Sequence, residues 1–284
     1  MASLAYGPPR RAADPRAVAS RAATRQIQES RLARSRWTPL LVPALLLAGW
    51  EAGSATGALP ASVLPAPVAV LTAGWQLTRD GTLPTNLAIS ASRALAGLAV
   101  GGTLGLLLGI ATAISVGLRR LLDPTIQALR SVPPFALLPL IILWLGIDEG
   151  AKIALIGWSV FFPLYLNSYH GVRSVDRSLL EMGRVYGMGR TTLFRRVTLP
   201  GALPSILVGI RFALGLMWLA LIVAETIAAS SGIGYMANQA REFSQTDVIV
   251  LTIVIYGALG KLTDTATRAA ERRLLRWNPA YGER

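Results

Sequence analysis

Residues 178–200 read SLLEMGRVYGMGRTTLFRRVTLP, a basic insert that separates two long apolar stretches. Apolar side chains recur in and just before this insert at intervals of three and four residues, which places them on one stripe of a helix. They are Val175, Leu179, Met182 and Tyr186. The pattern predicts a short amphipathic helix. Because the insert lies outside the apolar stretches, only water or a partner protein can cover its stripe.

A second short helix is predicted after a glycine break. Gly187 and Gly189 can supply the positive φ that ends a helix. Thr191 or Thr192 can then cap the second helix. We expect Pro200 to end that helix, since proline disfavours helical geometry at the residue before it. The insert is therefore predicted to be a compact helix–turn–helix.

Composition places this insert in a membrane protein. The chain of 284 residues is 52% hydrophobic and 15% charged, and long apolar runs recur along it. These proportions are typical of an all-α, polytopic membrane protein. The chain has no cysteine, which excludes disulfides, thiolate metal sites and cysteine nucleophiles. His170 is the single histidine, so we expect no metal site.

Six membrane spans are predicted, and the basic residues give their orientation. The spans are 37–57, 87–116, 121–147, 152–170, 205–229 and 248–266. With the N-terminus inside, twenty-two of the 28 basic residues fall in the N-terminal tail, a turn at Arg119 and Arg120, the 173–196 segment and the C-terminal stretch from Lys261 onward. Cytoplasmic segments carry such an excess. We therefore expect both termini and the insert on the cytoplasmic side of a bacterial inner membrane.

The net charge of +13 raises the question of nucleic-acid binding. Residues 1–36 carry eight arginines, but no aromatic residue interleaves with them to stack on bases. We therefore expect no nucleic-acid partner, a cytoplasmic tail over 1–36, a membrane domain over 37–270 and a basic tail over 271–284. No apolar run with a small-residue cleavage site occurs at the start, so no signal peptide is expected.

Small residues recur every fourth position in the second predicted span. They are Gly97, Gly101, Gly105 and Gly109. One face of this helix therefore lacks side chains, and the spacing predicts close approach of another helix backbone. We expect a packing role for these glycines, with no chemistry implied.

The third predicted span contains Pro133, Pro134 and Pro139. Prolines remove backbone hydrogen bonds, so this helix is predicted to be kinked or broken. Broken helices at membrane depth border protein or a water-filled cavity. Pro133 and Pro134 are therefore candidate residues of a pathway or gate.

Arg211 and Glu225 are ionisable residues of the fifth predicted span, and such residues are functional candidates by default. Arg211 lies about two turns inside the span, and its side chain can extend to the cytoplasmic headgroups. Glu225 lies about 30 Å along the helix and is predicted near the outer face. An ordinary helix-end role is favoured for Glu225 over a gate. Arg93 and Arg211 are the cations within spans that an anion could meet, and interfacial positions explain both.

The insert resembles the EAA loop of ABC-importer permeases. In that family Glu-Ala-Ala precedes a glycine and then Ile-x-Leu-Pro at fixed spacing, and Glu181, Gly187, Val197, Leu199 and Pro200 follow this spacing here. The resemblance implies that the insert is a coupling helix that docks into a groove on a cytoplasmic ATPase subunit.

Three side chains depart from the family pattern. Met182 and Gly183 stand where the family has two alanines, and Val197 stands for its isoleucine. The alternative interpretation of the start of the insert is a capping box. In it, the side chains of Ser178 and Glu181 accept hydrogen bonds from the free backbone N–H groups at the helix N-terminus, and neighbouring arginines form exposed ion pairs of little energetic value.

The wider resemblance runs from about residue 59 to 281. It is to permeases of the nitrate, sulfonate and taurine importer group, and above all to aliphatic-sulfonate permeases. The stretches LLPLIILWLGIDEGAKIALI and GALPSILVGIRFALGLMWLALIVAETIAASSGIGYMANQAREFSQTDVIV and the ending RWNPAY carry it. It implies a type I, MetI-like permease fold and transport of an aliphatic sulfonate, with taurine or nitrate as alternatives.

The resemblance also implies the partners. They are two ATPase subunits, a second copy of this chain, membrane lipid, and a periplasmic or lipid-anchored substrate-binding protein. Residues 260–262 lack both the glycine spacing and the Ser or Thr of a Walker A loop. We therefore expect no enzyme activity and no cofactor in this chain, with ATP and Mg²⁺ used by the partner ATPase.

An ion-coupled secondary transporter or channel is the competing hypothesis. Such a protein needs acidic or histidine relays near the bilayer centre, or inverted repeats with broken helices. The spans show no mid-depth carboxylate pair, and no clear internal repeat is found. A membrane-embedded enzyme is disfavoured by the single histidine and the absence of cysteine.

Overall fold

The computed structural model describes residues 38–278, which fall into two compact units. The first unit ends at Leu59 and contains one described helix, α2 (Thr38–Ala55). The apolar part of α2, Leu41–Ala55, is shorter than a typical membrane span. The predicted tail 1–36 and residues 279–284 of the predicted C-terminal tail lie outside the described residues.

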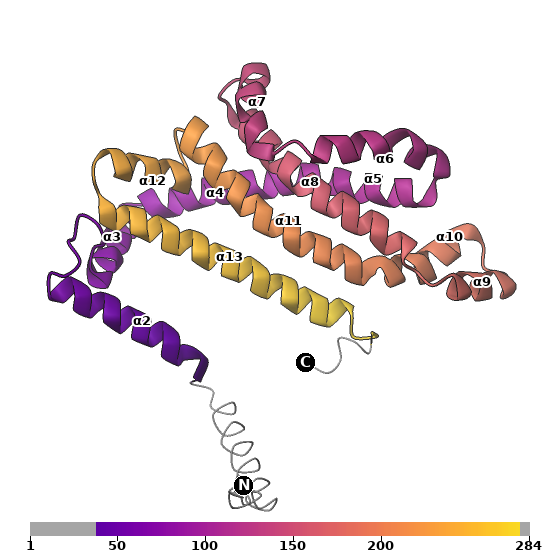
Figure 1. The fold of residues 1–284 in the computed structure, drawn as a ribbon, viewed down its shortest axis with the longest axis horizontal. Helices are drawn as coiled ribbons and strands as arrows, with labels where there is room; N and C mark the ends of the chain where they lie inside the picture. Colours follow the sequence, from indigo (N-terminus) through magenta and orange to yellow (C-terminus); the bar gives the residue numbers. More distant parts are fainter. Residues whose placement is uncertain (1–37, 279–284) are drawn as a thin grey trace, which may run out of the picture. The chain divides into compact units, whose positions relative to one another are not determined.

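The second unit begins at Pro60 and is helical in its regular elements (Figure 1). Its helices are α3 (Pro67–Arg79), α4 (Thr82–Gly97), α5 (Thr103–Ile114), α6 (Val116–Arg130), α7 (Leu138–Leu145), α8 (Glu149–Arg173), α9 (Arg177–Val185), α10 (Arg190–Leu193), α11 (Leu199–Ala228), α12 (Ile233–Glu242) and α13 (Thr246–Leu274). Single π-helical turns join α4 to α5 (Leu98–Gly102) and α10 to α11 (Phe194–Thr198), and a 3₁₀ turn (Pro134–Leu137) precedes α7.

Three continuous helices of the described chain are long and apolar enough to cross a membrane unaided. They are Thr82–Ile114, Arg190–Ala228 and Thr246–Leu274, which overlap the predicted second, fifth and sixth spans almost completely. The bent pair α6 and α7 makes a fourth if it counts as one span. By length and composition, the six predicted spans are therefore not all recovered, since α2 is short and α8 is more polar. The all-α, polytopic class itself is confirmed.

The third predicted span is broken, as its prolines predict. Helix α6 and the Pro134–Leu145 segment meet at 90°. The expected turn at Arg119 and Arg120 was wrong, because both residues lie inside α6. The turn is instead at Ser115, whose hydroxyl caps α6 by accepting a hydrogen bond from the backbone N–H of Leu118 at 3.3 Å.

Helix α8 is the centre of the second unit. It packs along α11 and α5, and Figure 1 shows it running beside α11. The main apolar core joins α4, α8 and α11 through Ile156, Val160, Met217 and Leu221, among others. Polar groups within spans are tolerated where they face protein. This explains how α8 can be less apolar than its neighbours, because Lys152, Ser159 and Ser168 are all buried.

The glycine stripe faces the backbone of α8. A Cβ built on Gly101, Gly105 or Gly109 would overlap the carbonyl oxygens of Gly157, Phe161 and Tyr165 respectively. The four-residue spacing therefore matches on both helices. Gly97 faces the side chain of Ile156 instead. No side chain larger than hydrogen fits at this contact without moving α8.

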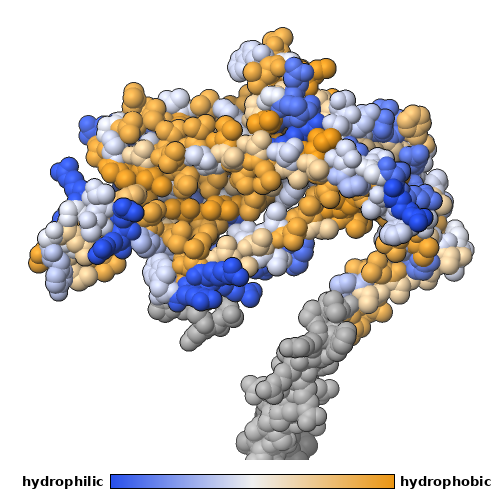
Figure 2. Space-filling model, turned by 180° about the vertical axis from the view of Figure 1, so that it is seen from behind, coloured by the Kyte–Doolittle hydropathy of each residue, from blue (hydrophilic) through white to orange (hydrophobic). Residues whose placement is uncertain are grey.

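Much of the surface is apolar, which suits contact with lipid or with other helices. Leu95 and Leu104 of the first long span, Phe212 and Leu219 of α11, and Ile253 of α13 are all more than 45% exposed. Figure 2 shows apolar residues across a broad face, with hydrophilic residues around its margins. Exposed apolar surface of this extent is typical of membrane-embedded protein.

Candidate functional site

The predicted helix–turn–helix insert is formed by α9 and α10. Helix α9 begins after Asp176, whose carboxylate accepts a hydrogen bond from the backbone N–H of Ser178 at 2.9 Å. That bond lowers the pKa of Asp176. The predicted capping box was therefore wrong, because Asp176 and not Ser178 caps the helix. The predicted threonine cap was also wrong, since α10 begins after Gly189 without a side-chain cap.

Gly187 makes the turn between the two helices. Its φ of +74° lies in the left-handed region, where a Cβ is disfavoured. The backbone N–H of Gly187 donates to the carbonyl of Arg184 at 2.9 Å, and that of Met188 donates to Gly183 at 3.0 Å. These bonds close the end of α9 and direct the chain toward α10.

Gly183 lets α9 and α10 pack against each other. It is buried, and a Cβ on it would lie 2.5 Å from Cδ1 of Leu193, which is itself buried. At the base of α9, Val175 packs against Gly201 of α11. The insert is therefore a small folded unit fixed to the start of α11.

Pro200 does not end a helix, contrary to the prediction. Residues Arg190–Ala228 form one continuous helix, with the π-helical turn that contains Val197 followed directly by Leu199 and Pro200. Proline is tolerated in the first turn of an α-helix, where N–H groups lack intrahelical partners. Helix α10 therefore continues into α11 without an intervening loop.

Apart from Val175, which is buried against α11, the apolar stripe of α9 is uncovered in the described chain. Its members Leu179, Met182 and Tyr186 are 45%, 51% and 77% exposed, and Val185 beside them is 86% exposed. Glu181 on this short helix is exposed and has no ion-pair partner among residues 38–278. A compact helical unit that leaves apolar side chains and a carboxylate in solvent offers a docking surface.

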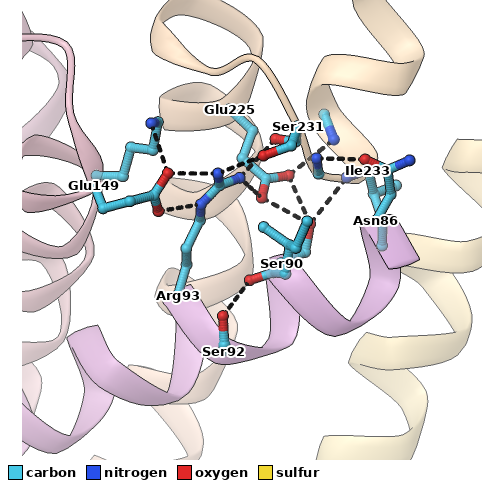
Figure 3. Close-up of polar contacts among 12 residues, drawn as sticks. Asn86, Ser90, Ser92, Arg93, Glu149, Glu225, Ser231 and Ile233 are labelled. Carbon is cyan, nitrogen blue, oxygen red and sulfur yellow. Dashed lines mark hydrogen bonds and ion pairs between the residues drawn. The ribbon is translucent and has the colours of Figure 1, made fainter. Parts of the chain in front are cut away.

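A buried ion-pair cluster lies at the opposite end of α11 (Figure 3). Glu225 of α11 is completely buried and accepts hydrogen bonds from four groups. Both of its oxygens accept from the Ser90 hydroxyl, at 2.7 and 2.9 Å, and Oε1 accepts from Arg93 Nη1 at 2.8 Å. Oε2 also accepts from the backbone N–H of Gly234 at 2.9 Å and from the Tyr256 hydroxyl at 3.3 Å.

Arg93 of α4 joins this carboxylate to α8. Its Nε and Nη2 donate to the two oxygens of Glu149, at 2.6 and 2.7 Å, in the bidentate geometry that favours Arg–carboxylate pairs. Its Nη1 and Nη2 also donate to the backbone carbonyl and the hydroxyl of Ser231, at 2.6 and 2.9 Å. All five N–H groups of the guanidinium therefore have acceptors. Lys152 pairs with Glu149 at 3.0 Å and completes a neutral set of two cations and two anions.

Two sequence interpretations are corrected by this cluster. Arg93 does not extend to an interface, because it is only 3% exposed and bonded on all sides. Glu225 is not an ordinary helix-end residue, because it holds four donors from α4, α12 and α13. Its complete burial also means that it does not line an open passage within this chain.

Arg211, the other ionisable candidate, pairs with α13. It is 42% exposed and contacts the carboxylates of Asp264, at 3.9 Å, and Glu271. The sequence predicted that the Arg211 side chain extends to the headgroups, and its carboxylate partners on the last helix were not expected. Arg268 in turn pairs with Asp264.

The predicted pathway residues do not form one polar site. Pro133 is exposed and Pro134 half-buried at the bend between α6 and α7, and the 3₁₀ turn that Pro134 opens contacts α11, where Arg211 and Glu225 each pair with other residues. An apolar groove of about 550 Å³ lies between α5, α6 and α8, and none of these four residues lines it. Trp158 and Phe161 are among its lining residues. The described chain alone therefore shows no continuous polar pathway.

Sequence reasoning missed Ser90, Glu149 and Asn86 as members of the cluster. A signal was present, because Arg93 and Glu225 are opposite charges within two predicted apolar spans. Ionisable residues at such depth usually pair with each other. The sequence analysis treated Arg93 and Glu225 separately, so the ion pair between them was not predicted.

The chain is similar to known transport proteins. Residues 101–276 match the family described as "Binding-protein-dependent transport system inner membrane component". A permease of Escherichia coli K12 named for aliphatic sulfonates transport, SsuC, is 55% identical over 87% of this chain and 94% of its own length. The taurine transport system permease protein TauC of the same organism is 38% identical over 83% of this chain and 87% of its own length.

Solved structures resemble the fold. A chain from an inward-facing structure of the MetNI methionine ABC transporter superimposes with a TM-score of 0.52. The alignment covers 70% of this chain and 97% of that chain, at 20% identity. At this identity the likeness concerns the fold alone.

Proposed function

The chain belongs to the family of inner membrane components of binding-protein-dependent transport systems. On that premise we propose that it transports a small organic sulfonate into the cell and that ATP hydrolysis by a separate ATPase subunit drives this transport. It is a multi-pass permease subunit of an ABC importer. The observation that carries the choice of substrate is the 55% identity to a permease named for aliphatic sulfonates. Taurine is the second candidate, from the 38% identity to the taurine permease.

The partner ATPase docks on α9 in this proposal. The exposed stripe formed by Leu179, Met182, Val185 and Tyr186 supplies apolar contact area, and Glu181 supplies an unpaired carboxylate at its side. Aromatic and methionine side chains are enriched where proteins bind each other. Gly183 and Gly187 hold α9 in a defined orientation, and Val197, Leu199 and Pro200 join it to α11.

The energy comes from outside this chain. We expect it to bind neither ATP nor Mg²⁺, which two copies of the ATPase use. Two copies of this chain form the pathway between them, and a binding protein delivers the substrate from the outer side. The charge bias of the sequence supports cytoplasmic termini and a cytoplasmic α9.

Transport proceeds by alternating access. Closure of the ATPase pair on ATP moves α9 and, through the continuous Arg190–Ala228 helix, the outer end of α11. The bend at Pro133 and Pro134 gives a second place where the spans can change angle. The ATPase must bind α9 differently in the two states, since equal binding shifts no equilibrium.

The test is uptake of a labelled alkanesulfonate into proteoliposomes. They contain this chain co-expressed with its ATPase, with ATP inside and a loaded binding protein outside. We expect uptake that needs both ATP and the binding protein. We also expect Met182→Glu to abolish it, because a charge then faces the apolar contact.

Thr191→Ala on α10 is the matched control, since Thr191 is exposed and its side chain has no hydrogen bond to lose among residues 38–278. Competition by unlabelled taurine or nitrate separates the candidate substrates. Uptake that continues without ATP, or that is unchanged in Met182→Glu, contradicts the proposal.

A further inference from the structure

We propose that Glu225 and Arg93 are positioning residues that make the outer loop before α12 move as one body with α11, so that docking of a binding protein on this loop reaches the ATPase. The inference rests on the proposed function. It concerns residues that touch neither the ATPase surface nor an open passage.

The first observation is the continuity of α11 with the insert. Residues Arg190–Ala228 form one helix of 39 residues. From Leu199 to Glu225 the helix rises about 39 Å, at 1.5 Å per residue. Figure 1 shows that α9 and α10 lie at one end of this helix and α12 at the other. Glu225 therefore lies on the same continuous helix as α10, against which α9 packs.

The second observation is how the outer loop is held. The backbone N–H groups that open α12 have no side-chain cap from the loop itself. Those of Gly232 and Ile233 donate to Asn86 at 2.6 Å and to Ser90 at 2.9 Å, and that of Gly234 donates to Glu225. Side chains of α4 and α11 thus cap α12 from outside its own segment (Figure 3).

The loop comes so close to Glu225 and Arg93 that position 232 requires glycine. Gly232 has a φ of +107°, and a Cβ there would overlap the carboxylate of Glu225 and lie 2.7 Å from Nη1 of Arg93. Arg93 also holds Ser231 by its carbonyl and its hydroxyl. The loop therefore has no room to move independently of α11.

The third observation is that this loop borders an accessible hollow. A cavity of about 370 Å³ is lined by residues 147–149 and Lys152 on one side and by 227–230 on the other. Glu149, whose side chain is 56% exposed, lies at the boundary between this hollow and the buried cluster. A protein that presses on the hollow displaces Ser231 and Glu149. Both are bonded to Arg93, which is bonded to Glu225.

Glu225→Gln tests the link with little change in volume. A carboxylate only accepts hydrogen bonds, and all four groups around Glu225 donate. A glutamine amide presents a donor to other donors, so at least one partner is released. The readout is the ratio of ATPase activity with a loaded binding protein to activity without it, in proteoliposomes of the assembled transporter.

We expect Glu225→Gln to assemble and to hydrolyse ATP without the binding protein as the parent does. The stimulation ratio falls by about tenfold, as expected for loss of a charge-assisted hydrogen bond. Ser90→Ala, which removes one donor to Glu225 and the acceptor of Ile233, lowers the ratio by about threefold. Arg241→Ala is the control, because Arg241 is on α12 but bonds only to Asn238 of the same helix.

The outcomes separate this inference from the proposed function. If the parent transporter is not stimulated by any loaded binding protein, the proposed function fails. If the parent is stimulated and Glu225→Gln matches it, the positioning role is overturned. If Glu225→Gln does not assemble, Ser90→Ala decides alone. A reduced ratio supports the role, and a ratio equal to that of Arg241→Ala overturns it.

Discussion

The two ends of the Arg190–Ala228 helix are built on opposite principles. At the α12 end, Glu225 is completely buried and every donor around it is satisfied. At the α9 end, Val185 and Tyr186 are more than three-quarters exposed. A saturated polar cluster fixes its own elements, whereas an uncovered apolar stripe is completed by another molecule. The first end is therefore held by its own contacts, and the second is the docking surface that we propose.

The ion pairs of α11 repeat this contrast. Arg93 and Glu225 are desolvated, so losing Arg93 leaves the buried carboxylate of Glu225 without its cation, whereas Arg93 without Glu225 keeps its pair with Glu149. Arg211 is 42% exposed, and water screens its contacts with Asp264 and Glu271. Loss of Arg93 should therefore destabilise the protein strongly, and loss of Arg211 should do so only weakly. Damage at the insert should instead weaken the proposed contact with the ATPase.

The largest effect is expected for Arg93→Met. The substitution removes the partner of buried Glu225 and costs about 3–5 kcal/mol of stability. Thermal unfolding of the purified protein in detergent measures the loss. The double variant Arg93→Met/Glu225→Leu should recover part of it, because the uncompensated charge is gone. Equal unfolding temperatures for the parent and Arg93→Met would show that the buried Arg93–Glu225 pair does not stabilise the fold.

A smaller and more local effect is expected for Gly183→Leu. The new side chain collides with Leu193 and forces α9 away from α10, at about 1–3 kcal/mol for an overpacked contact. We expect weaker co-purification of the ATPase with little change in unfolding temperature. Gly189→Ala is the matched control, because a Cβ there meets nothing within 4 Å. Global unfolding of Gly183→Leu would show that the insert is not an independent unit.

Arg211→Gln should cost about 1 kcal/mol or less, as exposed ion pairs do. High salt should reduce the difference between this variant and the parent, because ions screen exposed charges. The measurement is thermal unfolding at low and high ionic strength. A loss of stability as large as that of Arg93→Met would show that the half-exposed pairs of Arg211 and the buried pair of Arg93 do not differ in strength.

The smallest effect is expected from Asp176, which is fully exposed. Its pKa is lowered in the folded loop by the bond from Ser178, so its contribution is present above the ordinary aspartate pKa. The contribution is lost as the pH falls through the folded-state value. Protection factors of the α9 amides, which correct exchange rates for their intrinsic pH dependence, should therefore fall at acid pH in the parent and already be low at neutral pH in Asp176→Ala. Identical protection in both proteins at neutral pH would exclude the cap.

Patterns that depend on neighbours in sequence were predictable. The spacing of Gly101, Gly105 and Gly109 predicts a helix face without side chains, and such a face meets the α8 backbone. The prolines at 133, 134 and 139 predict a break, and a 90° bend is present. In both cases the relevant physics acts within one helix.

Features that depend on distant segments were not predictable in the same way. Arg93 and Glu225 are 132 residues apart, and no local pattern tells which carboxylate an arginine meets. Their burial is decided by the packing of α4, α8 and α12 around them. The role of Pro200 was also mispredicted, because the same proline that ends one helix is tolerated in the first turn of another.

Photocross-linking tests the central contrast most directly. The chain has no cysteine, so a single benzophenone maleimide can be attached to Met182→Cys on α9 or to Phe243→Cys after α12. Both native side chains are more than half exposed. In membranes that contain the co-expressed ATPase, we predict a cross-link to the ATPase from position 182 and none from position 243. A cross-link from position 243, or none from 182, would contradict the assignment of α9 as the docking surface.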